Sequence, residues 1–308
     1  MFRPLLASCI VAAAAHASVA AAQPEPVFIR DAKGCSLFDP VPKDGESVIW
    51  AGACRDGFAE GAGTLQWVEA GVPGTTYIGR LSRGRATGHG TETFANGSRF
   101  DGEFANGHRN GHGVMTWKTG ARFEGEYVDG HRTGHGALDL GDGTRYEGNF
   151  EGDEVMGQGA ITFQGARLEG TFTRGQLSGP GVLIQLVSAG VHRLPVDVGP
   201  ATSTAPEATP SSAPGSPHIV DFRTCRPIYP TSSARSHATG TSSFALLVDA
   251  DGQVQRARIT QPNGDDLVHQ LLDMSALVAL SNCQIVAGTL DGRPAARWFN
   301  LRFEWRLE

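Results

Sequence analysis

The 308-residue sequence lacks an excess of positive charge: 26 Lys and Arg residues oppose 32 Asp and Glu residues, which gives a net charge of −6. Nucleic-acid-binding chains carry basic patches, so the charge balance excludes nucleic acid as the main partner. Residues 77–184 hold eleven Arg and Lys residues against thirteen Asp and Glu residues. Anionic lipid attracts clustered Lys and Arg, so this balance disfavours lipid binding as well.

The sequence also lacks the patterns of catalytic and metal sites. No nucleophile–base pair, phosphate-binding loop or metal cluster stands out, and the cysteines have neither the CxxC nor the Cys/His spacing of zinc sites. Asp265 and Asp266 precede an apolar pattern with helical spacing, so they predict a helix start rather than a pair of catalytic carboxylates. We expect no enzymatic activity, no cofactor and no metal.

Near the N-terminus, Arg3 is followed by an apolar run that ends in the small residues Ala20–Ala21–Ala22. This pattern predicts a cleaved signal peptide over residues 1–22. The alternative is a retained membrane anchor, although an Ala-dominated run interrupted by Ser8, His16 and Ser18 makes a weak span.

Removal of the signal peptide would leave four cysteines, and an even number in an exported chain predicts disulfides. Three pairings are possible. The cysteines form two groups on either side of the central residues, which favours Cys35–Cys54 and Cys225–Cys283.

Residues 77–184 contain two repeating markers. An aromatic–X–Gly triplet recurs every 23 residues from Tyr77, Phe100, Phe123 and Tyr146, with a weaker copy at Leu168. A Gly–X–Gly triplet keeps the same phase at 88–90, 111–113, 134–136, 157–159 and 179–181. Two markers in phase over five copies identify a repeat protein.

Each copy predicts one β-hairpin, because two short strands alternate with turns rich in Gly, Asn and His. The glycines would supply positive φ angles or leave room for an aromatic ring. A single hairpin is marginally stable, so the copies must stack and bury their aromatic residues. The predicted fold is mainly β: an elongated single-sheet stack of hairpins, followed by a Pro-rich linker and a small α+β domain.

The histidines His89, His112 and His135 also recur in phase. Side chains in phase lie about 10 Å apart in a repeat of two strands, whereas each zinc ligand must lie about 2.0–2.1 Å from the metal. We therefore expect exposed histidines rather than a shared metal site.

These repeats resemble the MORN repeat family, and Trp50–Trp67 resembles a divergent first copy. The resemblance implies a scaffold that holds partners, dimerises or contacts lipid head groups, without catalytic machinery. The expected boundaries are an N-terminal cap over 23–49, the hairpin rod over 50–187, a linker rich in Pro, Ser and Ala over 188–218, and a C-terminal domain over 219–308.

The C-terminal domain shows a hairpin signal at Asp251–Gly252, a helical pattern from Leu267, and a last strand over Phe299–Trp305. In that strand Phe299, Leu301, Phe303 and Trp305 alternate with Asn300, Arg302 and Glu304.

These features, together with Cys225–Arg226–Pro227–Ile228–Tyr229–Pro230, resemble the C-terminal domain of the TonB family. The resemblance implies a periplasmic domain that binds an extended peptide of a partner protein at its sheet edge. In the energy-coupling members, a Gln before the Pro–X–Tyr–Pro run faces that peptide, and Arg226 takes this position here.

The sequence thus predicts a non-enzymatic periplasmic scaffold that binds envelope proteins as extended peptides. The candidate partner-binding residues are Arg226, Tyr229, Asn300, Arg302 and Glu304. The alternative is an energy-transducing TonB homologue, anchored in the inner membrane and facing the periplasm. The repeats and the C-terminal domain also offer surfaces for a homo-oligomer.

Overall fold

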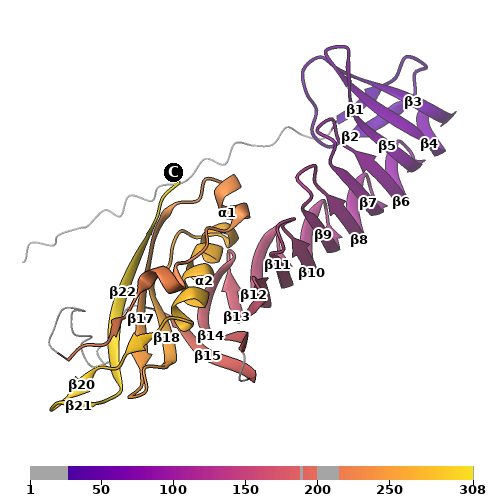
Figure 1. Ribbon diagram of the computed structural model, residues 1–308. Coiled ribbons are helices and arrows are strands. Elements are labelled where there is room, and N and C mark those ends of the chain that lie inside the picture. The colour runs from indigo at the N-terminus through magenta and orange to yellow at the C-terminus, as the bar shows by residue number, and fades with distance from the viewer. Residues whose placement is uncertain (1–26, 188–189, 200–214, 308) are drawn as a thin grey trace, which may run out of the picture.

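The computed structural model describes residues 27–187, 190–199 and 215–307. The signal peptide expected over 1–22 lies outside these residues. Figure 1 shows an elongated sheet that runs from an N-terminal cap to a C-terminal domain, where the helices lie. Within the described ranges, no helix has the length and apolar character to span a membrane.

The strands divide into those of the cap and rod and those of the C-terminal domain. The first group comprises β1 (Val27–Arg30), β2 (Ser36–Asp39), β3 (Glu46–Arg55), β4 (Phe58–Glu69), β5 (Val72–Ser82), β6 (Arg85–Thr93), β7 (Arg99–Ala105), β8 (His108–Thr116), β9 (Arg122–Val128), β10 (His131–Asp139), β11 (Arg145–Glu151), β12 (Glu154–Phe163), β13 (Ala166–Thr173), β14 (Gln176–Val187) and β15 (Gly190–Val198). The C-terminal domain comprises β16 (His218–Ile219), η1 (Phe222–Cys225), α1 (Thr231–Arg235), β17 (Gly240–Val248), β18 (Val254–Gln261), α2 (Leu267–Ser281), β19 (Ile285–Val286), β20 (Thr289–Leu290), β21 (Arg293–Pro294) and β22 (Arg297–Trp305).

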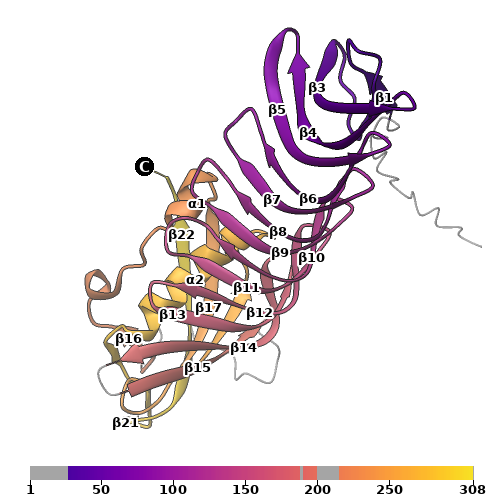
Figure 2. The same ribbon diagram turned by 90° about the vertical axis from the view of Figure 1, so that its right-hand side faces the viewer.

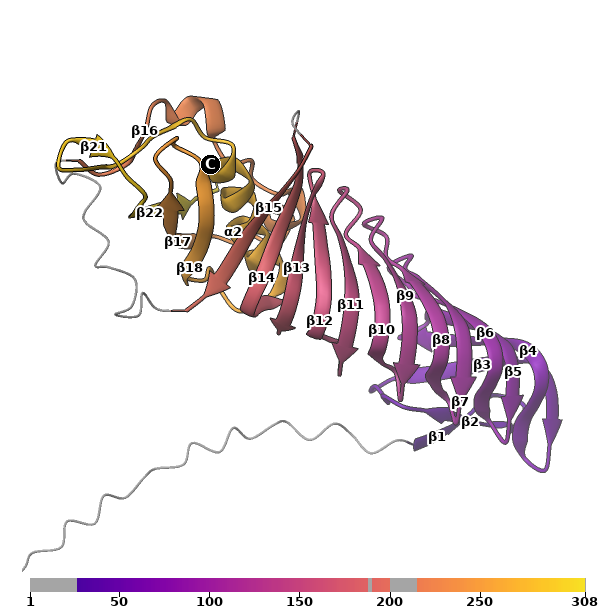
Figure 3. The ribbon, with the colours of Figure 1, turned by 90° about the horizontal axis from the view of Figure 1, so that it is seen from below.

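One sheet unites both groups. From β3 to β15 each strand pairs antiparallel with the next along the chain. Strand β15 then pairs in parallel with β18, and the order continues through β17 to β22. Figure 3 shows the strands side by side along the length of the molecule. The predicted fold class, a long sheet of successive hairpins with a small α+β domain, is confirmed.

The paired glycines have separate roles. In four of the five Gly–X–Gly triplets the first glycine has a positive φ, 99° at Gly111, a conformation that favours glycine. The second, Gly113, lies opposite Gly102 on the neighbouring strand, and an added Cβ would lie 2.4 Å from Phe100 Cε2. The same arrangement recurs in the next repeats, so a row of glycines crosses the sheet and leaves room for one ring per repeat.

The rings above these glycines form a continuous edge-to-face stack. Neighbouring ring centroids lie 4.9–5.7 Å apart at interplanar angles of 77–88°. The stack runs in the order Tyr77, Phe104, Phe100, Tyr127, Phe123, Phe150, Tyr146, Phe172. All eight side chains are buried, so the aromatic marker of the repeat is the core of the rod. Figure 2 shows the curvature of the strands that carry it.

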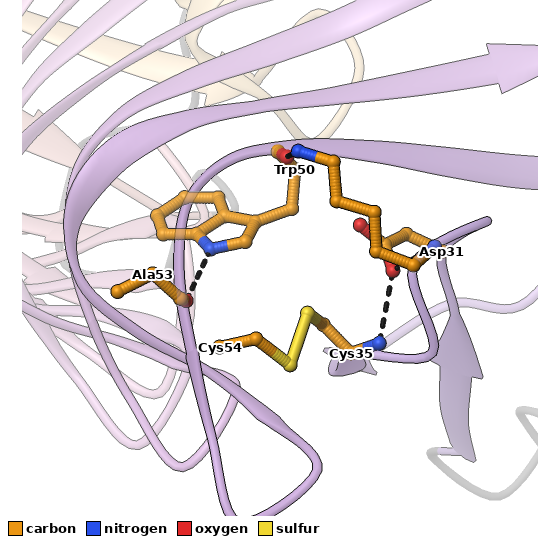
Figure 4. Close-up of a disulfide and its surroundings, with 6 residues drawn as sticks. Asp31, Cys35, Trp50, Ala53 and Cys54 are labelled. Carbon is orange, nitrogen blue, oxygen red and sulfur yellow. Dashed lines mark hydrogen bonds between the residues drawn. A yellow bond between two sulfur atoms is a disulfide. The ribbon is translucent and has the colours of Figure 1, made fainter.

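The cap is joined to β3 by the Cys35–Cys54 disulfide (Figure 4). The Lys33 Nζ donates to the main-chain oxygen of Trp50 at 3.3 Å, and the Trp50 indole Nε1 donates to the Ala53 oxygen at 2.7 Å. The disulfide and the Lys33 hydrogen bond attach the cap to β3, whereas the bond to Ala53 lies within β3 and orients the fully buried Trp50 indole.

The linker expected over 188–218 is wrong at its N-terminal end, because Gly190–Val198 form β15. Leu194 and Val196 are buried and alternate with exposed neighbours, as in a half-buried strand. The prolines in this stretch hid the alternation, since Pro195 occupies an exposed position of the strand. Residues 200–214 lie outside the described ranges.

Helix α2 packs on β12 and β14 of the rod as well as on β17 and β18. Gln270 Oε1 accepts a hydrogen bond from the Leu177 main-chain nitrogen at 2.7 Å, and Gln176 Nε2 donates to the Asp266 main-chain oxygen at 2.9 Å. The C-terminal domain is therefore docked onto the last repeats rather than joined to the rod by a linker alone.

Candidate partner-binding edge of the sheet

Strand β22 lies at the C-terminal edge of the long sheet. It pairs antiparallel with β17 over its full length, from Arg297↔Val248 to Trp305↔Gly240. Among the described residues, β17 is the only strand with which β22 pairs. In an antiparallel ladder alternate residues direct their N–H and C=O groups to each side. Half of the main-chain groups of β22 therefore face an open edge.

The side chains of β22 alternate as the sequence predicts. Phe299 and Trp305 are buried, and Leu301 and Phe303 are half-buried on the same side. The candidate residues Asn300, Arg302 and Glu304 are all exposed. Glu304 Oε2 accepts from Arg306 Nη2 at 2.8 Å; both side chains are largely exposed, so this ion pair contributes little to stability.

Arg226 and Tyr229 lie beside the C-terminal half of β22. Both line a pocket of about 260 Å³, together with Glu304 and Trp305. The Tyr229 ring packs edge-on against Trp305 at 5.4 Å, and its hydroxyl donates to the Ala238 main-chain oxygen. Burial raises the pKa of the Tyr229 hydroxyl. Tyr229 is thus held in place, whereas the Arg226 side chain is exposed.

The five candidate residues do not form one cluster. Arg226, Tyr229 and Glu304 share the pocket, while Asn300 and Arg302 lie further along β22. Asn300 and Glu304 are four positions apart on the strand, which corresponds to about 13 Å. This is an extended row, the shape that an added strand would follow.

Sequence reasoning missed Phe222 and the role of Phe303. The two rings stack with centroids 6.0 Å apart and planes at 29°, although Phe222 is far from β22 in the chain. Phe222 and Ile228 remain 38% and 61% exposed. Through its stacking on Phe303, Phe222 provides an apolar surface beside β22. The alternation of β22 placed Phe303 correctly on the inner side, but no signal in the sequence marked Phe222.

The segment that carries Arg226 is fixed at its base. The Cys225–Cys283 disulfide joins it to the end of α2, with the two Cα atoms 5.2 Å apart. Asp221 caps η1 by accepting from the Arg223 main-chain nitrogen at 2.9 Å. Both expected cysteine pairs are therefore bonded in the structure.

A buried polar network connects β22 to the rod. Trp305 Nε1 donates to Ser242 Oγ at 2.9 Å, and Ser242 in turn contacts the Asp273 carboxylate. Asp273 Oδ2 accepts a hydrogen bond from the Asn263 main-chain nitrogen at 3.0 Å. Burial raises the pKa of Asp273 to about 7. Gln176 of the rod donates to the Asn263 oxygen at 3.2 Å, so the edge strand and the last hairpin share one network.

The histidines of the repeats lie on exposed positions. His89 Nε2 lies 3.3 Å from Asp101, and His112 lies 3.6 Å from Glu124. Across the residues that the structure describes, no three His, Cys, Asp or Glu side chains gather as a metal site would require.

Comparisons with known proteins agree with the architecture. The MORN repeat family matches residues 77–99, 100–122, 123–145 and 169–184. The family described as Gram-negative bacterial TonB protein C-terminal matches residues 226–307. The resemblance to both families that the sequence shows is therefore confirmed. Both are binding modules without catalytic machinery, and together with the disulfides they fit an extracellular or periplasmic interaction scaffold.

No curated protein matches this chain. Among solved structures, the SAS-4 (dCPAP) TCP domain of Drosophila melanogaster, in complex with a proline-rich motif of Ana2 (dSTIL), is 12% identical. The match covers 62% of this chain and 96% of that one, at a TM-score of 0.25. This likeness is too low to support a conclusion about function.

Proposed function

We propose that this chain of MORN repeats and a TonB-type C-terminal domain is a non-enzymatic periplasmic scaffold that binds an extended segment of an envelope protein along the open edge of β22. An added strand takes its affinity from main-chain hydrogen bonds and its selectivity from alternate side chains. The observation that carries the proposal is the absence of a second pairing strand for β22 among the described residues.

The side chains around this edge define what the segment would contain. The pocket beside Glu304 has room for one side chain of the segment. Arg226 is exposed beside it, and a guanidinium binds a carboxylate through paired hydrogen bonds. We therefore expect an acidic residue in the segment at this point. The exposed Phe222 ring, which stacks on Phe303 of β22, would take an apolar residue nearby.

The rod sets the position of this edge. The strands β3 to β15 stack over roughly 60 Å at the usual strand spacing, and the α2 contacts join the C-terminal domain to them. A rigid connection of this kind would hold a bound segment at a fixed distance from the N-terminal cap. The export signal expected over 1–22 and the two disulfides support the periplasm as the compartment.

The test uses residues 23–308, called the mature chain, because the rod contacts the C-terminal domain through α2. Labelled ten-residue synthetic peptides with one Asp, Glu or Lys at varied positions are titrated and followed by fluorescence anisotropy. We expect acidic peptides to bind best. Arg226→Glu should weaken them about tenfold or more, since hydrogen bonds to charged groups contribute about 1.5–3 kcal/mol, and should reverse the preference toward Lys.

Arg193→Glu is the matched control, because Arg193 is exposed on β15 and carries the same charge change away from β22. If Arg193→Glu weakened the binding of acidic peptides as much as Arg226→Glu does, net charge rather than a contact with Arg226 would explain the preference. Peptides methylated at alternate main-chain nitrogens supply a second test: one of the two methylation registers should abolish binding and the other should spare it. Equal loss in both registers, or no peptide that binds better than about 1 mM, contradicts strand addition.

A further inference from the structure

The far end of the rod contains a second concave surface. A pocket of about 760 Å³ lies between the cap and the turns of the first repeats. Its walls include Phe28 and Arg30 of β1 and Phe58 of β4. Arg83 of the β5–β6 turn, Arg85 at the start of β6 and Asn106 line it as well. Strand β22 lies at the opposite end of the sheet (Figure 1), so this pocket is separate from the proposed peptide edge.

The charges that line this pocket have one sign. Three arginines line it, and no Asp or Glu is among its lining residues. Within the described part of the chain, Arg30, Arg83 and Arg85 form no ion pair with a carboxylate. Glu60 Oε2 accepts a hydrogen bond from the Arg83 main-chain nitrogen at 2.8 Å, not from its guanidinium group.

Arginines in the following repeats are neutralised. Arg109 Nη2 lies 2.8 Å from Glu92 Oε2, and Arg132 Nε lies 3.0 Å from Asp153 Oδ1. Like Arg85, both guanidinium groups lie over phenyl rings. Arg109 and Arg132 thus have carboxylate partners, whereas among the described residues Arg30, Arg83 and Arg85 have none.

The guanidinium of Arg85 is already ordered. Its Cζ lies 3.9 Å from the centre of the Phe38 ring and 5.2 Å from that of Phe28. One of its five N–H donors, on Nη1, bonds the Asn106 main-chain oxygen at 3.2 Å. A group that is fixed before binding loses less conformational entropy when a ligand arrives.

The β5–β6 turn, which carries Arg83 and leads into Arg85 of β6, is fixed as well. Gly84 donates to the Ala59 main-chain oxygen at 2.9 Å, and its own oxygen accepts from the Phe38 nitrogen at 2.9 Å. Both the rod and the cap thus hold the turn in place. The arginines project from a defined backbone rather than from a free loop.

An apolar wall stands beside these cations. Phe28 is 44% exposed, and its ring contacts Phe38 and Phe58 edge-on at 5.9 and 5.7 Å. Guanidinium groups match the geometry of phosphate and carboxylate oxygens, while the exposed ring would cover an apolar or aromatic group. The ligand chemistry that fits is an oxyanion carried on an apolar body.

We propose that this pocket binds a small amphiphilic oxyanion, a phosphate or carboxylate attached to an aromatic or aliphatic group. Its charged end bonds Arg83 and Arg85, with Arg30 completing the positive field, and its apolar part packs on Phe28 and Phe58. The site would be independent of peptide binding at β22.

Phenyl phosphate and benzoate are the probes, titrated into the mature chain at low salt and followed by calorimetry. Inorganic phosphate and phenol, the two parts of phenyl phosphate, are titrated separately. We expect saturable binding of the complete probes, at least about tenfold tighter than either half. The amide signals of residues 82–87 should shift in NMR spectra. Arg83→Gln and Arg30→Gln should each weaken binding, and the double variant about tenfold or more.

Arg145→Gln is the matched control, because Arg145 is an exposed arginine of β11 outside this pocket. Arg85→Lys keeps the charge and removes the planar guanidinium group with its paired N–H donors. Because Arg85 packs on Phe38, the thermal melting of this variant is measured as well. The proposal is overturned if no probe binds, if the Arg30→Gln/Arg83→Gln double variant binds like the parent, or if inorganic phosphate binds as tightly as phenyl phosphate.

Discussion

Phe123→Ala tests whether the ring stack is the core of the rod. Phe123 is fully buried, lies edge-on to Tyr127 at 5.5 Å and to Phe150 at 4.9 Å, and covers Gly125 and Gly136. Truncation of a buried Phe costs about 3–5 kcal/mol. Glycines have no side chain to move into the space, so the cavity cannot close easily, and we expect the upper part of that range.

The assay is urea unfolding followed by circular dichroism and by tryptophan fluorescence. Trp117 lies in the rod, whereas Trp298 and Trp305 lie in the C-terminal domain. Repeat proteins unfold as coupled neighbours, so loss of this ring could separate the transitions on either side of it. Separate transitions would appear as different midpoint urea concentrations in circular dichroism and in tryptophan fluorescence.

Two further variants complete this test. Gly136→Ala adds a Cβ at 2.6 Å from Phe123 Cε2 and Cζ, and overpacking of this kind costs about 1–3 kcal/mol. Val128→Thr changes an exposed residue of the same hairpin and should stay within about 0.5 kcal/mol. A loss below about 1 kcal/mol for Phe123→Ala would refute the burial argument and leave the ring available for binding.

Other expected outcomes concern the buried carboxylate and the disulfides. Burial raises the pKa of Asp273 to about 7, so between about pH 4 and 7 the folded chain holds a proton that the unfolded chain releases. The stability from this group is complete below about pH 4 and is lost as the pH rises through 7. In urea titrations, the free energy of unfolding of Asp273→Asn should therefore rise relative to that of the parent by up to about 4 kcal/mol between pH 4 and 8. A difference that stays constant with pH would contradict the raised pKa. Non-reducing peptide mapping should find the disulfides Cys35–Cys54 and Cys225–Cys283. A disulfide that joins an N-terminal cysteine to a C-terminal one would contradict this pairing. The second bond closes a separation of 58 residues, so its loss should cost about 4 kcal/mol in the chain-entropy model.

The sequence predicts the rod well because its information is local. The aromatic and the two glycines that it contacts, such as Phe100, Gly102 and Gly113, lie within one repeat. The alternation of β22 is equally local, and it correctly separated Arg302 from Phe303. The start of α2 was also predictable, because Asp266 caps the helix by accepting from the His269 main-chain nitrogen.

The docking of the C-terminal domain was not predictable, because it depends on contacts between distant segments. Gln176 and Gln270 are buried polar residues whose partners are far away in the chain. Strand β15 pairs in parallel with β18, a pairing that no hairpin signal announces. The same holds for the cationic pocket, which joins Arg30 of the cap to Arg83 of a turn.

The most direct test of the peptide edge is residue-resolved amide hydrogen exchange of the mature chain, with and without the best-binding acidic peptide. Half of the amides of β22 already bond to β17, and the alternate half face the open edge. The proposal predicts that the alternate amides slow about tenfold or more when the peptide is saturating, while those that face β17 change little. Protection that appears elsewhere on the sheet, or unchanged exchange along Arg297–Trp305, would contradict strand addition at β22.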